Sequence, residues 1–289
     1  MIRVRKILVY VIAIFLTVWT LGPIYIMFDL SLMHSVEIFT IPFHFIPETP
    51  TPYNYARIFG VILPGRTYEP TLSEGALQSG FVNSAIATVV APLIGITLSV
   101  LAGYSFARYE FKFKGKLLIF LILTRALPPI TIIIPFYVIL SQFNLLGTYG
   151  GLIIVYLSMI TPLLTWVLIG HFATIPIDIE RAARTDGCSR LQTIRKVVLP
   201  IAASGILASL LIAAMMVWND FLFALIVSGG TRVQTLTPTI AGLFTNNTEY
   251  AIMSAAAVLG MIPTITVALL FQKYILRLRI VDPITAKAP

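Results

Sequence analysis

Three consecutive side chains with chemical potential interrupt an apolar run. Trp218, Asn219 and Asp220 place an indole ring, an amide and a carboxylate side by side among hydrophobic residues. A carboxylate in the middle of a membrane span costs about 2.5 to 3.5 kcal/mol on insertion scales, so Asp220 is expected to face a cavity or a partner rather than lipid. Arg125 is the only basic residue well inside a predicted span and is its candidate partner. The amide and the indole suit either a polar ligand or helix association, and the sequence leaves both open.

A second concentration of polar residues, ERAARTDGCSRLQTIRKVVLP, runs from Glu180 to Pro200. Pro176 can begin a helix, because a missing N–H is tolerated in the first turn. In such a helix Ile179, Ala182 and Ala183 share one face, and the alanines make that face shallow. A shallow face permits close approach by another chain.

The middle of this stretch predicts a turn between two helices. Asp186-Gly187 is expected to end the first helix, with glycine in the left-handed conformation. Ser189 and Gln192 have the spacing of a capping box, which predicts that a second helix begins at once. Pro200 is expected to close this unit before the next apolar run. Spacing alone fits an ordinary basic, helical loop equally well.

Other kinds of chemistry have little support in the sequence. His34, His44 and His171 are scattered without metal-ligand spacing, and no paired acids or histidine cluster suggest an enzyme. No G-x-x-x-x-G-K-[ST] phosphate cradle occurs in the 289 residues. Cys188 is the only cysteine, so no intrachain disulfide can form.

The composition indicates a membrane protein. Hydrophobic residues make up 58% of the chain and charged residues only 11%, against about 25% in an average soluble domain. A helix needs about 20 apolar residues to cross a bilayer. Six runs qualify: Ile7 to Leu30, Phe81 to Ala107, Leu117 to Leu140, Gly147 to Phe172, Ile201 to Val227 and Ala251 to Leu276. Prolines inside them predict kinks.

The basic residues predict the orientation. With six spans both termini lie on one side, and sixteen of the 20 Lys and Arg residues fall on that side, against three on the other. The positive-inside rule places both termini and the stretch from Glu180 to Pro200 in the cytoplasm. We therefore expect a multi-pass protein of the cell membrane. The formal charge of +8 then reflects these loops, since nothing resembles a nucleic-acid module.

The predicted organisation is a single all-α transmembrane domain over residues 1–289. Residues 31–80 form a long extracytoplasmic loop, rich in proline and aromatic residues. Residues 173–200 form the cytoplasmic loop that carries the two short helices. A third outer stretch contains Asn246-Asn247-Thr248, which matches a glycosylation acceptor.

The order of Ala182-Ala183, Asp186-Gly187 and Leu199-Pro200 resembles the EAA signature of ABC importer permeases. The resemblance extends over most of the chain to the maltose-transporter type of carbohydrate importer, specifically its second permease. It is carried by Asn83-Ser84, AGYSFARYEFKFKGK from Ala102 to Lys116, Pro128-Pro129 with Pro135, and WNDFLFALI from Trp218 to Ile226.

The resemblance implies an ABC importer permease architecture, six transmembrane helices with a cytoplasmic coupling helix that docks on an ATPase subunit. It assigns ATPase coupling to Glu180, Ala182, Ala183, Asp186, Gly187, Leu199 and Pro200, and a candidate translocation pathway to Trp218, Asn219 and Asp220. The chain would form half of the pathway for a sugar. The implied partners are a homologous second permease, two ATPase subunits that bind ATP and Mg, and an extracytoplasmic sugar-binding protein. The chain itself would hold no cofactor and would not be an enzyme.

Departures from the family pattern and rival functions remain. Arg181 stands where the family has glutamate, with Glu180 one position earlier, and the tail LRLRIVDPITAKAP lacks the glycine-rich ending common in relatives. A permease for another small polar solute is an alternative. An ion-coupled secondary transporter is another, although only Asp220 lies well inside a span as an acid for an ion path.

Overall fold

All regular structure in the described residues is helical, which confirms the all-α prediction. The computed structural model describes residues 2–61, 72–246 and 249–275. Its elements are α1 (Ile2–Leu32), η1 (Glu37–Phe39), α2 (Tyr53–Ile58), α3 (Leu72–Arg108), α4 (Lys114–Ala126), α5 (Pro129–Gln142), α6 (Tyr149–Ala173), α7 (Ile177–Thr185), α8 (Arg190–Thr193), η2 (Ile194–Val198), α9 (Leu199–Trp218), α10 (Leu222–Ser228), α11 (Leu236–Asn246) and α12 (Tyr250–Ile275).

Within the described residues, five helices are long and apolar enough to cross a membrane. They are Lys6–Leu32, Gly75–Arg108, Tyr149–Ala173, Arg190–Trp218 and Tyr250–Gln272. These correspond to the first, second, fourth, fifth and sixth predicted spans. A sixth span is present only if α4 and α5 are counted together.

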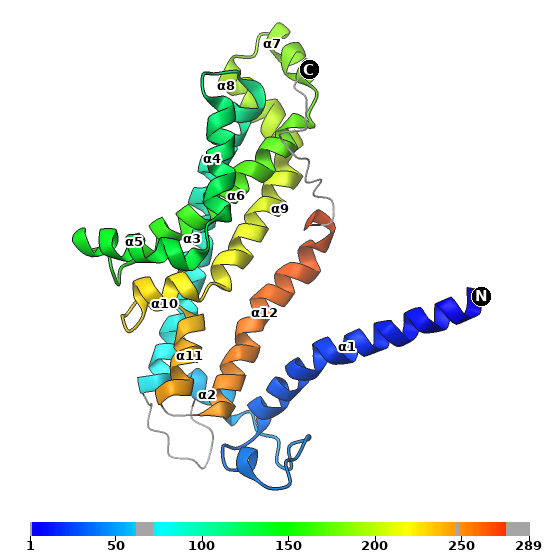
Figure 1. Ribbon diagram of the computed structural model, residues 1–289, viewed down its shortest axis with the longest axis vertical. Coiled ribbons are helices and arrows are strands. Elements are labelled where there is room, and N and C mark those ends of the chain that lie inside the picture. Colours follow the sequence, from blue (N-terminus) through cyan, green and yellow to red (C-terminus); the bar gives the residue numbers. More distant parts are fainter. Residues whose placement is uncertain (1, 62–71, 247–248, 276–289) are drawn as a thin grey trace. The chain divides into compact units, whose positions relative to one another are not determined.

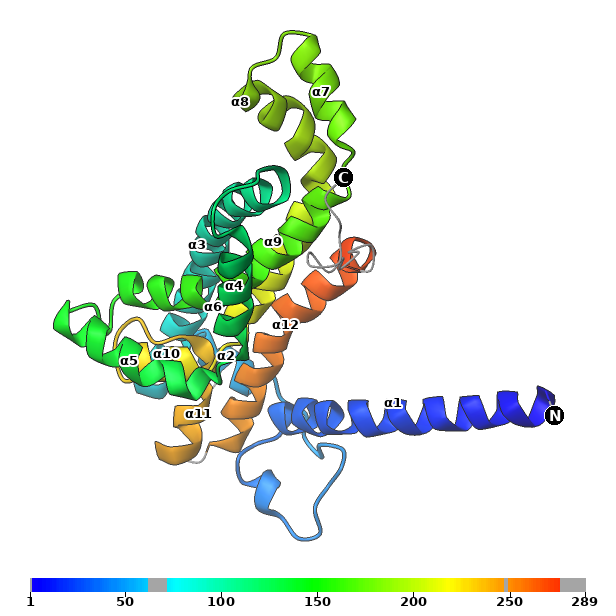
Figure 2. The ribbon, with the colours of Figure 1, turned by 45° about the horizontal axis from the view of Figure 1, so that its top comes forward.

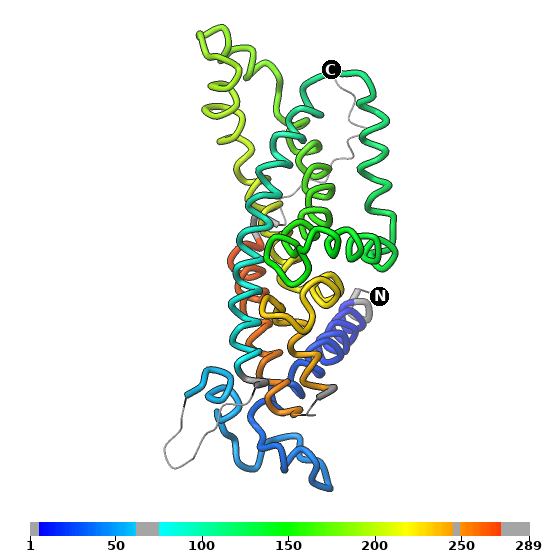
Figure 3. Tube along the Cα trace, turned by 90° about the vertical axis from the view of Figure 1, so that its left-hand side faces the viewer, coloured from blue at the N-terminus to red at the C-terminus, as the bar shows by residue number. Residues whose placement is uncertain are grey.

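The third predicted span is not one continuous helix: it bends at the predicted prolines, but as a full break rather than a kink. Helix α4 ends at Ala126, α5 begins at Pro129, and the two are bent by 98°. Figure 3 shows the trace turning sharply between them. Residues that precede a proline are pushed out of the helical region, and here both Leu127 and Pro128 precede one. Both are extended, with ψ of 129° and 134°.

The fifth predicted span differs from its prediction at both ends. Pro200 does not close the preceding unit, because the helix runs without interruption from Arg190 to Trp218. The π-helical turn η2 ends at Val198, two positions before Pro200, and widens the backbone where the proline ring would otherwise meet the carbonyl four residues earlier. At the other end α9 stops at Trp218, so the predicted continuation to Val227 forms the separate helix α10.

The outer segments contain more helix than predicted. Helix α3 begins at Leu72, so the loop predicted over 31–80 ends earlier, and α2 lies within it. Apolarity marks only the part of a helix that suits hydrocarbon and does not mark where the helix begins. The tail from 276 and the residues 247–248 of the glycosylation acceptor lie outside the described residues.

The chain divides into two compact units. The first comprises Met1–Phe81 with Thr239–Pro263, and the second comprises Val82–Pro238 with Thr264–Pro289. In the first unit, Asn54 donates from Nδ2 to the carbonyls of Ser31 (2.9 Å) and Met33 (2.8 Å), which fastens α2 to the end of α1. Most of the apolar length of α1 is exposed.

The second unit is built around α6. Its side chains Leu152, Val155, Tyr156, Ile160, Leu164, Leu168 and Phe172 are fully or almost fully buried. Helices α4, α9 and α10 pack against it, and Figure 1 shows α6 and α9 side by side. The junction of α9 and α10, where Trp218, Asn219 and Asp220 lie, is attached to this core.

Close approach of α9 to α6 depends on the small residue Gly205. A Cβ added at Gly205 would lie 2.3 Å from Nε2 of His171 on α6. Gly205→Ala should therefore lower the stability of the protein by about 1 to 3 kcal/mol, the usual range for overpacking. Thermal unfolding in detergent, followed by circular dichroism, measures this. Gly75→Ala is the control, since a Cβ there meets nothing within 4 Å; equal melting of both variants would contradict the prediction.

Candidate functional site

Helix α7 ends as the sequence predicts. Asp186 is its C-cap residue, and its backbone N–H donates to the carbonyl of Ala182 at 3.0 Å. Gly187 follows with φ of +90°, a conformation that side chains disfavour. The N–H of Cys188 then donates to the carbonyl of Ala183 at 3.1 Å. The predicted Asp-Gly turn is confirmed.

Helix α8 begins with the predicted capping box. Ser189 Oγ accepts from the N–H of Gln192 at 3.3 Å, and Gln192 Oε1 accepts from the N–H of Ser189 at 2.8 Å. Residues 177–198 therefore form a short helix, a tight turn and the start of the helix that continues into α9; this segment is called the α7–α8 hairpin below. Figure 2 shows this hairpin beyond the ends of α6 and α9.

The two faces of α7 have different environments. Ile179 and Ala182 are exposed on one face. Ile177, Glu180 and Arg184 line a pocket on the other. This division gives α7 one face fixed to the protein and one face open to a partner.

The remaining coupling candidates differ in exposure. Ala183, predicted to share the face of Ile179 and Ala182, is half-buried, as is Leu199. Asp186, Gly187 and Pro200 are exposed. The shallow face is therefore narrower than the sequence pattern predicted.

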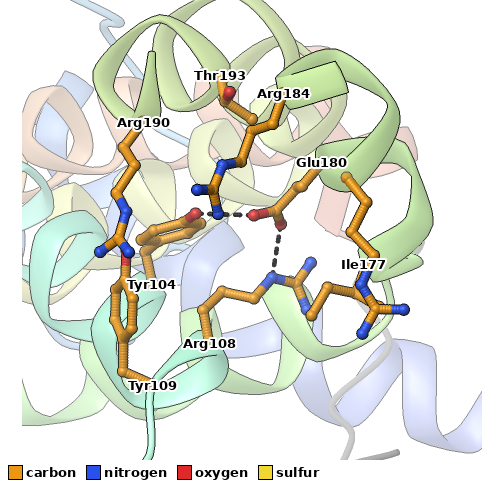
Figure 4. A pocket seen from close by; sticks show the side chains of 9 residues that line it. Tyr104, Arg108, Tyr109, Ile177, Glu180, Arg184, Arg190 and Thr193 are labelled. Atoms are coloured by element: carbon orange, nitrogen blue, oxygen red, sulfur yellow. Dashed lines mark hydrogen bonds and ion pairs between the residues drawn. The ribbon is translucent and has the colours of Figure 1, made fainter. Parts of the chain in front are cut away.

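Glu180 is buried against α3 rather than exposed. Its Oε1 accepts from Nε of Arg108 at 2.6 Å, and its Oε2 accepts from the hydroxyl of Tyr104 at 2.8 Å (Figure 4). Nη2 of Arg108 donates in addition to the carbonyl of Ile175 at 2.8 Å. Both carboxylate oxygens are therefore bound by side chains of this protein that lie more than 70 positions earlier in the sequence.

Arg108 and Tyr104 are functional candidates that residue-by-residue reading of the hairpin missed. Both lie within AGYSFARYEFKFKGK, at the end of the span Gly75–Arg108, and no periodicity pairs this run with the hairpin. An arginine at the end of an apolar helix was the available signal, because it needs an acid or water when it is buried.

Asp220 fulfils a local structural role. Its Oδ2 accepts from the N–H of Ala224 at 3.0 Å, near the start of α10, and its carbonyl accepts from the hydroxyl of Thr237. The buried Tyr156 of α6 lies beside it. A carboxylate at the start of a helix satisfies backbone donors that the helix itself leaves free.

The predicted pairing of Asp220 with Arg125 is wrong. Arg125 lies in the last turn of α4, and its Nη1 donates to the carbonyl of Met159 at 3.2 Å. Among the described residues no ion pair joins it to Asp220, whose Oδ2 accepts from the N–H of Ala224 instead.

Asn219 is the one exposed member of the Trp218, Asn219 and Asp220 group. Its Nδ2 donates to the carbonyl of Met215 (2.8 Å) and to the hydroxyl of Thr264 (3.3 Å) on α12. Trp218 and Asp220 are half-buried. The group therefore forms the break between α9 and α10, and Asn219 is its most accessible side chain.

Asn83 and Ser84 position the segment after α10. Asn83 donates to the carbonyls of Arg232 (2.9 Å) and Gln234 (2.8 Å) and accepts from the hydroxyl of Tyr149 (2.6 Å). Ser84 Oγ accepts from the N–H of Leu236 at 2.8 Å. These hydrogen bonds of buried side chains fix residues 232–236, which follow the WNDFLFALI run.

Sequence comparison identifies the class of protein. Residues 95–280 match the model of the family described as binding-protein-dependent transport system inner membrane components. The chain belongs to this family, and it is a multi-pass membrane protein.

Particular relatives narrow the class. The sulfoquinovosyl glycerol transport system permease protein SmoH of Agrobacterium fabrum is 31% identical, over 91% of this chain and 86% of its own length. The trehalose/maltose transport system permease protein MalG of Thermococcus litoralis is 29% identical, over 94% of both chains. A solved bacterial ABC transporter for import of the polysaccharide alginate contains a chain with the same fold, with a TM-score of 0.74, 20% identity and coverage of 94% of this chain and 96% of that one.

The Arg108–Glu180 ion pair predicts a strong energetic coupling. Glu180→Ala leaves a buried guanidinium without its carboxylate, so we expect a loss of about 3 to 5 kcal/mol, as for other broken buried pairs. The double variant Arg108→Met with Glu180→Leu should recover most of this loss. Chemical or thermal unfolding of the single and double variants measures the coupling.

The matched control is the exposed pair between Glu110 and Lys114, 2.6 Å apart. Glu110→Ala should change stability by no more than about 1 kcal/mol. Purely additive effects at Arg108 and Glu180 would contradict the proposed coupling.

Proposed function

We propose that this chain is the permease subunit of an ATP-driven ABC importer and forms half of the translocation pathway for a sugar. The family match and the full-length similarity to two sugar transport permeases support this function. The family description itself specifies dependence on a binding protein. We infer that an extracytoplasmic sugar-binding protein delivers the solute.

The observation that carries the proposal is the asymmetric attachment of the α7–α8 hairpin. Glu180 fastens one face of α7 to α3, whereas Ile179 and Ala182 stay exposed on the other. A partner that binds the exposed face can move the hairpin as a rigid body, and the ion pair passes the motion to α3. Such rigid-body motion suits alternating access.

The energy source is assigned to other chains. The sequence has no phosphate cradle, so ATP and Mg would be bound by two partner ATPase subunits that contact the α7–α8 hairpin. A homologous second permease would complete the pathway. In this arrangement the hairpin and both termini face the cytoplasm, as the distribution of basic residues predicts.

Asn219 is the pathway residue that the geometry favours. It is exposed, and its amide reaches across to Thr264 on α12. Asp220 already binds the start of α10, which supports helix capping over direct solute contact. The same bond is unfavourable for an ion-coupled transporter, which would need a carboxylate free to bind its ion.

A first prediction for transport concerns Gly187. Gly187→Val forces a β-branched residue into φ of +90°, where a Cβ meets no neighbour but the backbone is strained by more than about 1 kcal/mol. The turn should rearrange, so uptake falls while ATP hydrolysis by the assembled transporter continues. Uptake of labelled trehalose or maltose, measured beside phosphate release, tests this.

The control for that variant is Gly115→Val, because Gly115 also has open space but no positive φ. It should keep uptake and hydrolysis coupled. Normal uptake by the Gly187 variant would count against a coupling role of the hairpin.

A second prediction concerns Asn219. Asn219→Ala should raise the KM for sugar uptake about tenfold or more, since one good hydrogen bond to a solute contributes about 1.5 kcal/mol. Stability should fall little, because the side chain is exposed. Thr264→Val removes the same internal bond without removing the amide, so equal effects of both variants would assign Asn219 to packing instead.

A further inference from the structure

We propose that the pocket between α3 and the α7–α8 hairpin binds a phosphate group. The pocket has a volume of about 160 Å³, which is enough for several waters or a small oxyanion. Its lining includes Arg108, Arg181, Arg184, Arg190 and a single acid, Glu180. The inference goes beyond the transport function and does not depend on which solute is carried.

The lining has basic groups that its own acids do not neutralise. Both oxygens of Glu180 are bound, one by Arg108 and one by Tyr104. Arg181 pairs with Asp178 at 3.0 Å on the exposed surface. Among the described residues, Arg184 and Arg190 have no carboxylate partner within ion-pair distance, and Figure 4 shows both reaching into the pocket.

The position of Arg190 is preset by an aromatic ring. Its guanidinium lies over the ring of Tyr109, 5.9 Å from the centroid, and Tyr104 meets Tyr109 edge to face at 6.2 Å. A stacked guanidinium keeps its N–H donors free in the plane of the group. Paired guanidinium groups bind phosphate through several charge-assisted hydrogen bonds. The pocket therefore offers fixed donors as well as positive charge.

Two sources can supply the phosphate. Arg108 ends the apolar span Gly75–Arg108 and also lines the pocket, so the pocket lies level with the end of a membrane helix. Anionic lipid headgroups gather at that level, and basic pockets between helices bind them. Free phosphate in the surrounding water has the same chemistry. Either source would link Arg184 on α7 to Arg190 on α8 and hold the hairpin closed.

The first experiment measures protection of individual arginines. The full-length protein is treated with phenylglyoxal, which modifies guanidinium groups, and modification is located by mass spectrometry. Inorganic phosphate at about nine times its Kd should slow modification of Arg184 and Arg190 about tenfold, because only the unoccupied fraction reacts. Arg195, exposed on the next turn and outside the pocket lining, should react at an unchanged rate.

The second arm distinguishes the sources. The protein is placed in nanodiscs of phosphatidylcholine alone or with phosphatidylglycerol, each with and without added inorganic phosphate. Protection in the anionic nanodiscs without added phosphate assigns the site to a lipid headgroup, and protection that appears only on addition of phosphate, in both nanodiscs, assigns it to a soluble anion. If neither phosphate nor the anionic lipid protects these arginines, the proposal is overturned. That outcome would also be expected if an acidic side chain of a partner subunit were the true occupant of the pocket.

Variants add a readout that does not depend on modification. Phosphate or phosphatidylglycerol should raise the melting temperature of the unmodified protein, and Arg184→Gln or Arg190→Gln should abolish that rise. Arg195→Gln removes the same charge from the same loop and should retain it. An equal loss in all three variants would show general charge screening and would overturn the site. A transporter that fails to take up sugar but keeps this protection would disprove the proposed function alone.

Discussion

The buried contact of Glu180 with Arg108 and Tyr104 is the constraint on which the hairpin depends. Helix α7 has nine residues, and a helix this short is marginal in water, whereas α8 continues through η2 into α9. The turn between α7 and α8 fixes the internal shape of the hairpin but not the position of α7 against α3. The Arg108–Glu180 ion pair, at 2.6 Å, fixes this position. The two groups must stay in hydrogen-bond contact, because separating them would leave two buried charges without partners. Such a pair specifies an arrangement more than it adds stability.

The two helix breaks in the second unit support one another. Pro128-Pro129 ends α4, and the segment from Asn219 to Phe221 ends α9; the helices that follow, α5 and α10, pack together. Irregular backbone at membrane depth requires partners for its polar groups. Asp220 accepts a hydrogen bond from a backbone N–H of α10, and Asn83 donates to backbone carbonyls of the segment that follows α10. The polar residues of the WNDFLFALI run are therefore needed wherever the backbone is broken, whether or not a solute touches them.

Short-range patterns in the sequence predicted the turns, the caps and most of the membrane helices. The capping box at Ser189 and the turn at Gly187 follow from short-range rules and are present, and four of the six apolar runs lie in single helices. The prolines predicted a kink at Pro128-Pro129, but the full break was not predicted, because hydropathy ignores backbone geometry. The burial of Glu180 was missed because its partner Arg108 is 72 residues away, and no local pattern encodes such a contact. The true contact of Asp220 is a backbone N–H, which a search among charged side chains overlooks.

Besides the chain segment that enters from α6, the hairpin has two connections to the rest of the second unit, and they differ in kind. One is the ion pair from α7 to α3. The other is the helix from α8 through η2 into α9, which contains a widened turn at Ile194–Val198. Such π turns are frequent at functional sites. In the proposed coupling, a force on Ala182 would reach α3 through the ion pair and α9 through the widened turn. Because α9 packs directly on α6, the widened turn is where the hairpin could change its angle to this core.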